Sequence, residues 1–184
     1  MTLYGAALGV IWLTFSLVWL VGALTAKRMV RRSWFGDIWW RAGIIASVIV
    51  LFNLLQGSPY LTGVLPIPAL NVLGVVCTAA GVALAVWARV YLGRNWGMPL
   101  TVKESPELVT SGPYATIRNP IYTGVLLALL GSALVDWWWA VPLVWSAAYF
   151  VYASGREEQL MLKEFHDTYP AYKARTWRLI PFIY

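Results

Sequence analysis

Long apolar segments alternate with short polar segments along the whole chain. An apolar run of about 20 residues is long enough to cross a bilayer as a helix. We predict five membrane-spanning helices, over residues 3–24, 39–55, 70–92, 120–135 and 137–154. Pro120 suits the first turn of the fourth helix, because its missing N–H would be unpaired there anyway. Asp136 and the three tryptophans after it predict a tight turn, so the last two spans form a helical hairpin.

The composition supports a membrane location. Of the 184 residues, 60% are hydrophobic and only 12% are charged, and the mean hydropathy is +0.65. A soluble domain of this size could not bury so much apolar surface. We therefore expect an all-α, polytopic membrane helix bundle that forms a single domain. The third span also carries small residues that permit close helix packing: Gly74, Ala80, Gly81 and Ala85.

The charge pattern predicts the orientation of this bundle. When the five spans are threaded alternately through a bilayer, all 14 Lys and Arg residues fall on one side, which the positive-inside rule assigns to the cytoplasm. The N-terminus is then outside and the C-terminus inside the cytoplasmic (inner) membrane. The net charge of +6 is too scattered to predict a nucleic-acid surface. The single cysteine, Cys77, and the lack of a Cys/His cluster in the sequence argue against disulfide, thiol or metal chemistry.

Two polar segments, residues 93–119 and 155–184, flank the helical hairpin and must both emerge on the cytoplasmic side. They are too small to form a domain of their own. We therefore expect them to fold together as a small cytoplasmic cap on the bundle, which includes a C-terminal helix.

One carboxylate in this cap is predicted to be buried. The helical periodicity of residues 155–169 places Glu158 on the more apolar face, with Leu162, Phe165 and Tyr169. A buried carboxylate needs a cation as a partner, and Arg118 lies at the adjoining end of the fourth span. The pair can be interpreted as a structural salt bridge or as part of a ligand site.

Three short motifs follow one another in this half of the chain. They are Gly112-Pro113-Tyr114, then Arg118-Asn119-Pro120-Ile121-Tyr122-Thr123-Gly124, then Glu157-Glu158-Gln159-Leu160-Met161 before a tyrosine-rich tail. Their order and spacing, over residues 90–184, resemble the isoprenylcysteine carboxyl methyltransferase family, including its prokaryotic members. The chain departs from that family at Asn119, where histidine is usual. An amide can still position a ligand by hydrogen bonding but cannot transfer a proton.

The resemblance implies a methyltransferase whose cofactor, S-adenosylmethionine, binds in the cytoplasmic cap. The methyl acceptor would be a lipophilic molecule, lipid or prenylated compound that enters from the bilayer. The implied catalytic residues are Arg118, Glu157 and Glu158. The implied cofactor-binding residues are Gly112, Pro113, Tyr114, Arg118, Asn119, Pro120, Tyr122, Glu158, Tyr169 and Tyr172. A carboxylate acceptor would be held by Arg118, whereas an amine or hydroxyl acceptor would need Glu157 or Glu158 as a base.

Two other functions compete with this interpretation. NADPH-dependent sterol reductases have a similar pattern and a tail like Ile180-Pro181-Phe182-Ile183-Tyr184, but many carry an acidic residue where this chain has Val125. A non-catalytic lipid-binding protein or small transporter is disfavoured because the predicted spans place no ionisable residue near mid-membrane. His166, alone on a helix of mixed polarity, is expected to be solvated. The sequence leaves the acceptor and the oligomeric state open.

Overall fold

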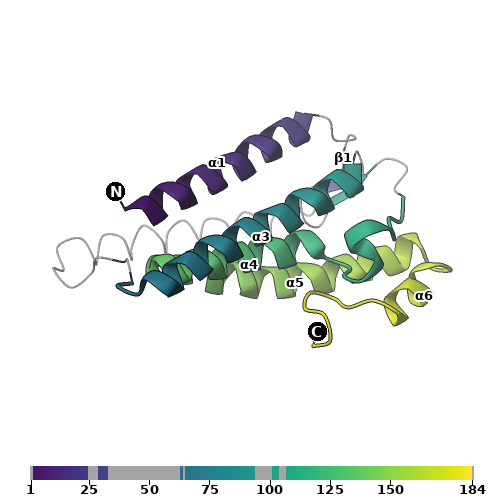
Figure 1. The fold of residues 1–184 in the computed structure, drawn as a ribbon. Helices are drawn as coiled ribbons and strands as arrows, with labels where there is room; N and C mark the ends of the chain where they lie inside the picture. The colour runs from purple at the N-terminus through teal and green to yellow at the C-terminus, as the bar shows by residue number, and fades with distance from the viewer. Residues whose placement is uncertain are drawn as a thin grey trace.

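The computed structural model describes residues 2–24, 29–32, 63, 65–93, 101–103 and 107–183. Four long helices run side by side in this part of the chain (Figure 1): α1 (Leu3–Leu24), α3 (Pro68–Leu92), α4 (Pro120–Val135) and α5 (Ala140–Glu164). The shorter elements are β1 (Met29–Arg32), β2 (Thr101–Lys103), η2 (Gly112–Ala115), η3 (Trp137–Trp139) and α6 (Tyr169–Ala174). The helices predicted over 3–24, 70–92 and 120–135 are confirmed to within two residues, and the one over 39–55 lies outside the described residues.

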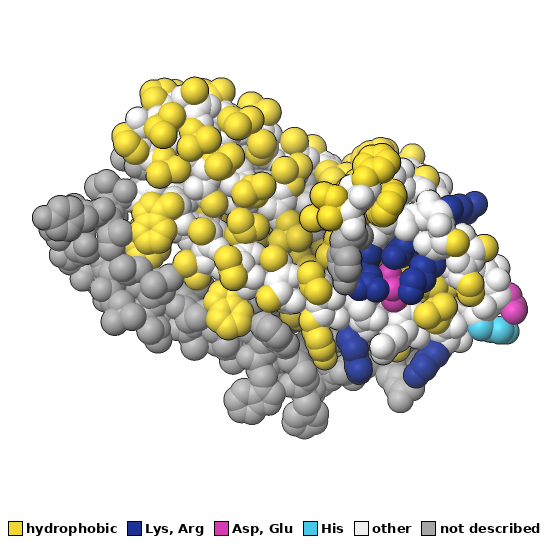
Figure 2. All heavy atoms as spheres, turned by 90° about the horizontal axis from the view of Figure 1, so that it is seen from below, with side chains coloured by type: hydrophobic (Ala, Val, Ile, Leu, Met, Phe, Trp, Pro, Cys, Tyr) yellow, Lys and Arg dark blue, Asp and Glu magenta, His cyan; other side chains and the backbone are white. Residues whose placement is uncertain are grey.

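The outer surface of the helices is apolar. Two helices of the described part, Leu3–Gly22 and Pro68–Leu92, are long and apolar enough to cross a membrane, and α4 is apolar but has only 16 residues. On α1, Leu13 is 60% exposed and Leu17 is 54% exposed. Figure 2 shows hydrophobic side chains over most of one face, with the charged ones gathered at one end. Apolar surface of this extent indicates contact with lipid or protein rather than water.

Helices α3 and α4 pack through opposed glycines. A Cβ atom on Gly81 would lie 2.5 Å from the carbonyl oxygen of Gly124, and one on Gly74 would lie 2.6 Å from that of Gly131. Any side chain at these points would push the two backbones apart. The predicted close packing is confirmed for three of the four small residues, Gly74, Gly81 and Ala85. Ala80 is exposed instead, because it lies about 100° around the helix from Gly81.

Two buried hydroxyl groups join the helices within this apolar region. Thr78 Oγ1 of α3 lies 3.2 Å from the carbonyl oxygen of Ala128 and 3.3 Å from Ser132 Oγ, both on α4. The indole N–H of Trp12 donates to Ser132 Oγ at 3.0 Å and so links α1 to α4. Buried polar groups are tolerated when they are hydrogen-bonded in this way.

The hairpin between α4 and α5 is confirmed. Asp136 closes the turn, since its Oδ1 accepts a hydrogen bond from the backbone N–H of Trp138 at 3.1 Å. The fifth span was expected to end at residue 154 and a separate cap helix to follow, but α5 continues unbroken to Glu164. The reason is that Gly155 is a single glycine ahead of strong helix formers, and one glycine costs a helix only about 1 kcal/mol.

The helix predicted over 155–169 ends five residues early, at Glu164. The prediction that Phe165 and Tyr169 share a helix face with Glu158 is therefore wrong. Phe165 leaves the helical conformation (ψ 50°), and α6 begins at Tyr169. Pro170 then occupies the first turn of α6, where a proline costs no hydrogen bond. Phe165 and Tyr169 therefore do not share a helix face with Glu158. His166 has a side chain that is 77% exposed, so the expectation that it is solvated is confirmed.

A short two-stranded ribbon was not predicted. Strands β1 and β2 pair antiparallel, with Met29 opposite Lys103 and Arg32 opposite Thr101. The ribbon joins the chain after α1 to the chain after α3, at the same end of the molecule as α6 (Figure 1). It was missed because strands of three and four residues are too short to show an alternating pattern.

Candidate active site

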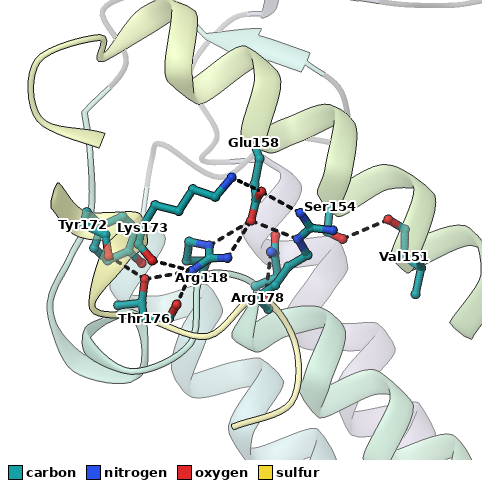
Figure 3. A network of polar contacts seen from close by, with 9 residues as sticks. Arg118, Val151, Ser154, Glu158, Tyr172, Lys173, Thr176 and Arg178 are labelled. Atoms are coloured by element: carbon teal, nitrogen blue, oxygen red, sulfur yellow. Dashed lines mark hydrogen bonds and ion pairs between the residues drawn. The ribbon is translucent and has the colours of Figure 1, made fainter. Parts of the chain in front are cut away.

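Glu158 on α5 is the centre of a charged cluster at the end of the molecule that carries α6 (Figure 3). Its carboxylate accepts hydrogen bonds from Arg118 (Nη2 to Oε1, 2.7 Å), Arg178 (Nη2 to Oε2, 2.8 Å) and Lys173 (Nζ to Oε2, 3.0 Å). The residue is only 3% exposed. The predicted burial of Glu158 and its pairing with Arg118 are therefore confirmed.

The charged partners decide the ionisation of this carboxylate. Burial alone would raise the pKa of Glu158, but the hydrogen bonds from Arg178, Lys173 and Arg118 outweigh it and lower the pKa to about 2. Glu158 is thus ionised throughout the physiological range. A carboxylate this acidic is poorly matched to general-base catalysis near neutral pH.

Arg118 ties the start of α4 to the C-terminal part of the chain. While its Nε and Nη2 groups face Glu158, its Nη1 donates to the carbonyl of Lys173 (3.1 Å) and to both the Oγ1 (3.2 Å) and the carbonyl of Thr176. Its backbone N–H donates to the carbonyl of Trp177 at 2.8 Å. All three guanidinium nitrogens are thus directed at protein groups. This geometry matches a structural clamp, and a catalytic role for Arg118 stays a prediction.

Glu157, which directly precedes Glu158 on α5, faces a different neighbour. The hydroxyl of Tyr122 on α4 donates a hydrogen bond to Glu157 Oε1 at 2.7 Å. The Tyr122 ring is buried and stacks on Phe150, with ring centroids 4.3 Å apart and planes at 7°. Because successive residues of a helix point about 100° apart, the two carboxylates face separate surroundings. Glu157 meets a neutral phenol, whereas Glu158 meets three cations.

The predicted tyrosines pack behind the charged cluster. Gly112 has a left-handed φ of 58°, and a Cβ atom there would lie 2.4 Å from the ring of Tyr91, so only glycine fits. The carbonyl of Tyr114 accepts a hydrogen bond from the Tyr172 hydroxyl at 2.8 Å. Burial raises the pKa of Tyr172 to about 12, so this hydroxyl stays a donor. Tyr169 lies beside it, with the ring centroids 5.8 Å apart.

Asn119 and its neighbours hold the C-terminal tail on the start of α4. The Asn119 side chain does not cap the helix; its Nδ2 donates to the carbonyl of Arg178 at 3.0 Å. Thr123 donates to the carbonyl of Leu179 at 2.5 Å, and Pro120 is fully buried in the first turn. The amide at position 119 thus acts as a hydrogen-bond donor to the backbone.

Three residues of the cluster were absent from the predicted site: Lys173, Thr176 and Arg178. Arg178 lies two residues before the Ile180-Pro181-Phe182-Ile183-Tyr184 run of the tail, so it could have been selected as a further partner of Glu158. Lys173 follows the predicted Tyr172 directly and carried a weaker signal. Thr176 acts through its carbonyl and hydroxyl at a turn, and no sequence pattern indicates it.

Comparison with known proteins identifies the family. A family model for phospholipid methyltransferases matches residues 70–168, more than half of the chain. The chain belongs to the phospholipid methyltransferase family. This is the group of membrane methyltransferases that resemble isoprenylcysteine carboxyl methyltransferase, so the predicted resemblance is confirmed. Together with the apolar helices, the match indicates a membrane protein of a methyltransferase family. The matched range includes Arg118, Tyr122 and both carboxylates, whereas α6 and the tail lie beyond it.

A bacterial protein that is named for metal resistance also matches. The chain is 31% identical over 145 residues to the cobalt-zinc-cadmium resistance protein CzcN of Cupriavidus metallidurans, a distant bacterial member of the same family. The alignment includes 77% of this chain but 62% of that protein, so the chain spans less than two thirds of its relative. In the described residues no three His, Cys, Asp or Glu side chains form a group that could hold a metal ion.

Proposed function

We propose that this protein is a methyltransferase that uses S-adenosylmethionine and methylates a lipophilic acceptor that reaches the site from the bilayer. Members of the phospholipid methyltransferase family generally use this cofactor. The observation that carries the proposal is the Tyr122–Glu157 hydrogen bond at the contact between α4 and α5. The carboxylate in this contact, Glu157, lies within the residues that match the family. It is separate from the three cations that surround Glu158.

The residues around this pair suit the chemical groups of the cofactor. The Glu157 carboxylate suits an ammonium group, which forms short charge-assisted hydrogen bonds with carboxylates. Phe150, which is half-buried and stacks on Tyr122, offers an aromatic face for a sulfonium or an adenine. When bound, the cofactor supplies a methyl group already activated on sulfur. The other residues implied by the resemblance are proposed to shape the surrounding wall: Gly112, Pro113, Tyr114, Asn119, Pro120, Tyr169 and Tyr172.

We propose one role for Glu157 and a different one for Arg118 and Glu158. Glu157 would contact the cofactor, and it would also accept the proton if the methyl acceptor is an amine or a hydroxyl. A carboxylate acceptor needs no base. Arg118 and Glu158 would act by holding α6 and the tail against the α4–α5 pair, which keeps the site in one geometry. This is a positioning role for two residues that the sequence predicted to be catalytic.

The membrane arrangement is part of the proposal. The bundle would cross the cytoplasmic membrane five times, with the N-terminus outside and the polar cap in the cytoplasm, where a soluble cofactor is available. The lipophilic acceptor would enter sideways from the bilayer. The apolar outer faces of α1 and α3 and the clustering of charge at one end support this arrangement (Figure 2).

Calorimetric titration of the detergent-purified protein with S-adenosylhomocysteine tests the cofactor assignment. We expect the wild type to bind and Glu157→Gln to bind about 10- to 100-fold more weakly, because a hydrogen bond to a charged group contributes about 1.5–3 kcal/mol. Glu164→Gln is the matched control, since this residue ends the same helix and is exposed. It should bind like the wild type.

Two results would contradict the proposal. If the wild type binds no S-adenosylhomocysteine while NADPH protects it against heat, the reductase interpretation replaces the cofactor assignment. If Glu157→Gln binds normally and retains the wild-type melting temperature, the cofactor contacts a different carboxylate.

A further inference from the structure

A hollow of about 350 Å³ opens beside the cation cluster, next to α5. Its wall includes Tyr152, Arg156, Gln159 and Leu162 of α5, Lys173 of α6 and Arg178 of the tail. Figure 2 shows Lys and Arg side chains gathered around an acidic side chain at the charged end of the molecule. The cluster is therefore open to the outside on this face, although Glu158 itself is buried.

The hollow faces away from the proposed methyl-transfer site. Tyr152, Arg156 and Gln159 recur at helical spacing and form one stripe along α5. Phe150 and Glu157, which contact Tyr122, belong to a second stripe. At about 100° per residue the two stripes lie on opposite sides of the helix. A ligand in the hollow would thus not touch the Tyr122–Glu157 pair.

The charge of the lining favours an anion. Three cations and one carboxylate line the hollow, which gives a net charge of +2. The carboxylate of Glu158 already accepts hydrogen bonds from Lys173, Arg178 and the buried Arg118. The Lys173 side chain is 41% exposed and that of Arg178 is 24% exposed. Guanidinium and ammonium groups converging on one place are the usual partners of phosphate oxygens.

An apolar strip begins where the charged hollow ends. Towards the middle of α5, Val144 is 67% exposed, Val151 is 47% exposed and Tyr152 is 42% exposed. Arg156 follows Tyr152 by four residues, about 6 Å along the helix axis. A cationic hollow that continues into an apolar strip at the end of a membrane helix complements a molecule with an anionic head and apolar tails.

We propose that this hollow binds the phosphate headgroup of an anionic phospholipid from the surrounding bilayer. The phosphate lies between Arg156, Lys173 and Arg178, and the acyl chains follow the exposed strip at Val144 and Val151. The lipid would hold α6 and the tail against α5 from the outside. The site is separate from the proposed methyl-transfer site and does not depend on the identity of the cofactor.

Thermal stability of the detergent-purified protein, titrated with short-chain phospholipids, tests the site. Dihexanoyl-phosphatidylglycerol should raise the melting temperature in a saturable way, and dihexanoyl-phosphatidylcholine, which has no net charge, should not. Arg156→Gln should raise the half-saturating phosphatidylglycerol concentration about fivefold, because one basic residue contributes about 1 kcal/mol to binding an anionic lipid. Lys173→Gln, which removes the cation of α6, should act in the same direction. Lys163→Gln is the matched control, since Lys163 is exposed in the last turn of α5 and outside the hollow.

Three results would overturn the proposal. Equal weakening by Lys163→Gln and Arg156→Gln would indicate general surface charge instead of a site. Equal stabilisation by inorganic phosphate at the same concentration would mean that the ligand is a free phosphate and not a lipid. Absence of any difference between the two phospholipids with the wild type would remove the site altogether. None of these results bears on S-adenosylhomocysteine binding, so the two proposals fail separately.

Discussion

Glu157 and Glu158 are neighbours in the sequence and carry the same functional group, but they have different surroundings. Glu158 points to Arg118, Lys173 and Arg178 and is only 3% exposed. Glu157 points to the α4–α5 contact, where the neutral hydroxyl of Tyr122 donates to it. The first carboxylate is held by fixed positive charge. The second is hydrogen-bonded to a neutral group at this helix contact.

This difference separates two roles that one motif had combined. A carboxylate surrounded by cations gives up much of its affinity for further cations, since its oxygens are already used. Its contribution is to join α5, α6 and the tail. The hydroxyl of Tyr122, in contrast, is neutral and does not offset the charge of Glu157. The different surroundings support the proposed cofactor contact for Glu157 and a structural role for Glu158.

Replacing Glu158 should have the largest effect on stability. In Glu158→Ala the buried Arg118 and its two neighbouring cations lose their counter-charge, and removing one partner of a buried ion pair costs about 3–5 kcal/mol. We expect a strong fall in the melting temperature in detergent and loss of the monodisperse peak in size-exclusion chromatography. Glu164→Ala, on the exposed end of the same helix, should change stability by less than about 0.5 kcal/mol. Similar stability of the two variants would show that the cluster does not hold the cap.

Acid should weaken the protein through the same residue. The pKa of Glu158 in the folded protein is about 2, below its ordinary value of 4.5, so the unfolded chain takes up this proton first as the pH falls. The stabilisation by ionised Glu158 is thus complete above about pH 4.5 and is lost progressively towards pH 2, by up to about 3 kcal/mol. Melting temperatures measured between pH 3 and pH 7, against Glu158→Gln, isolate this effect. An equally steep acid limb in Glu158→Gln would assign it to other carboxylates.

Removing the Tyr122 hydroxyl should have the smallest effect. Tyr122→Phe keeps the stacking on Phe150 and deletes one hydrogen bond to the Glu157 carboxylate, and a hydrogen bond to a charged group contributes about 1.5–3 kcal/mol. We expect weaker binding of S-adenosylhomocysteine and a fall in melting temperature that is smaller than in Glu158→Ala. A drop in stability without any change in binding would instead make the pair a structural contact like that of Glu158, and the comparison between the two carboxylates would fail.

Much of the fold follows from the order of apolar and polar residues. The positions of α1, α3 and α4 and the hairpin at Asp136 were predicted from the lengths of apolar runs and the placement of Pro120. The burial of Glu158 and its pairing with Arg118 were predicted too, because a buried carboxylate needs a cation and Arg118 lies at the adjoining end of the fourth span. These features depend on local pattern and simple charge balance, which a sequence carries directly.

Other features needed the folded chain. The continuous α5, the start of α6 at Tyr169 and the β1–β2 ribbon depend on small differences between competing local structures, which tertiary contacts decide. Lys173, Thr176 and Arg178 reach Glu158 or Arg118 only because the tail folds back over the start of α4.

The sequence by itself determined that this is an apolar helical protein with a methyltransferase motif and a paired Arg118 and Glu158. Only the tertiary structure decided that Lys173 and Arg178 also surround Glu158 and that Glu157 faces Tyr122. The reason is geometric. A helix turns each residue about 100° from the last, and the packing of α4, α6 and the tail around α5 selects the partner of each side chain.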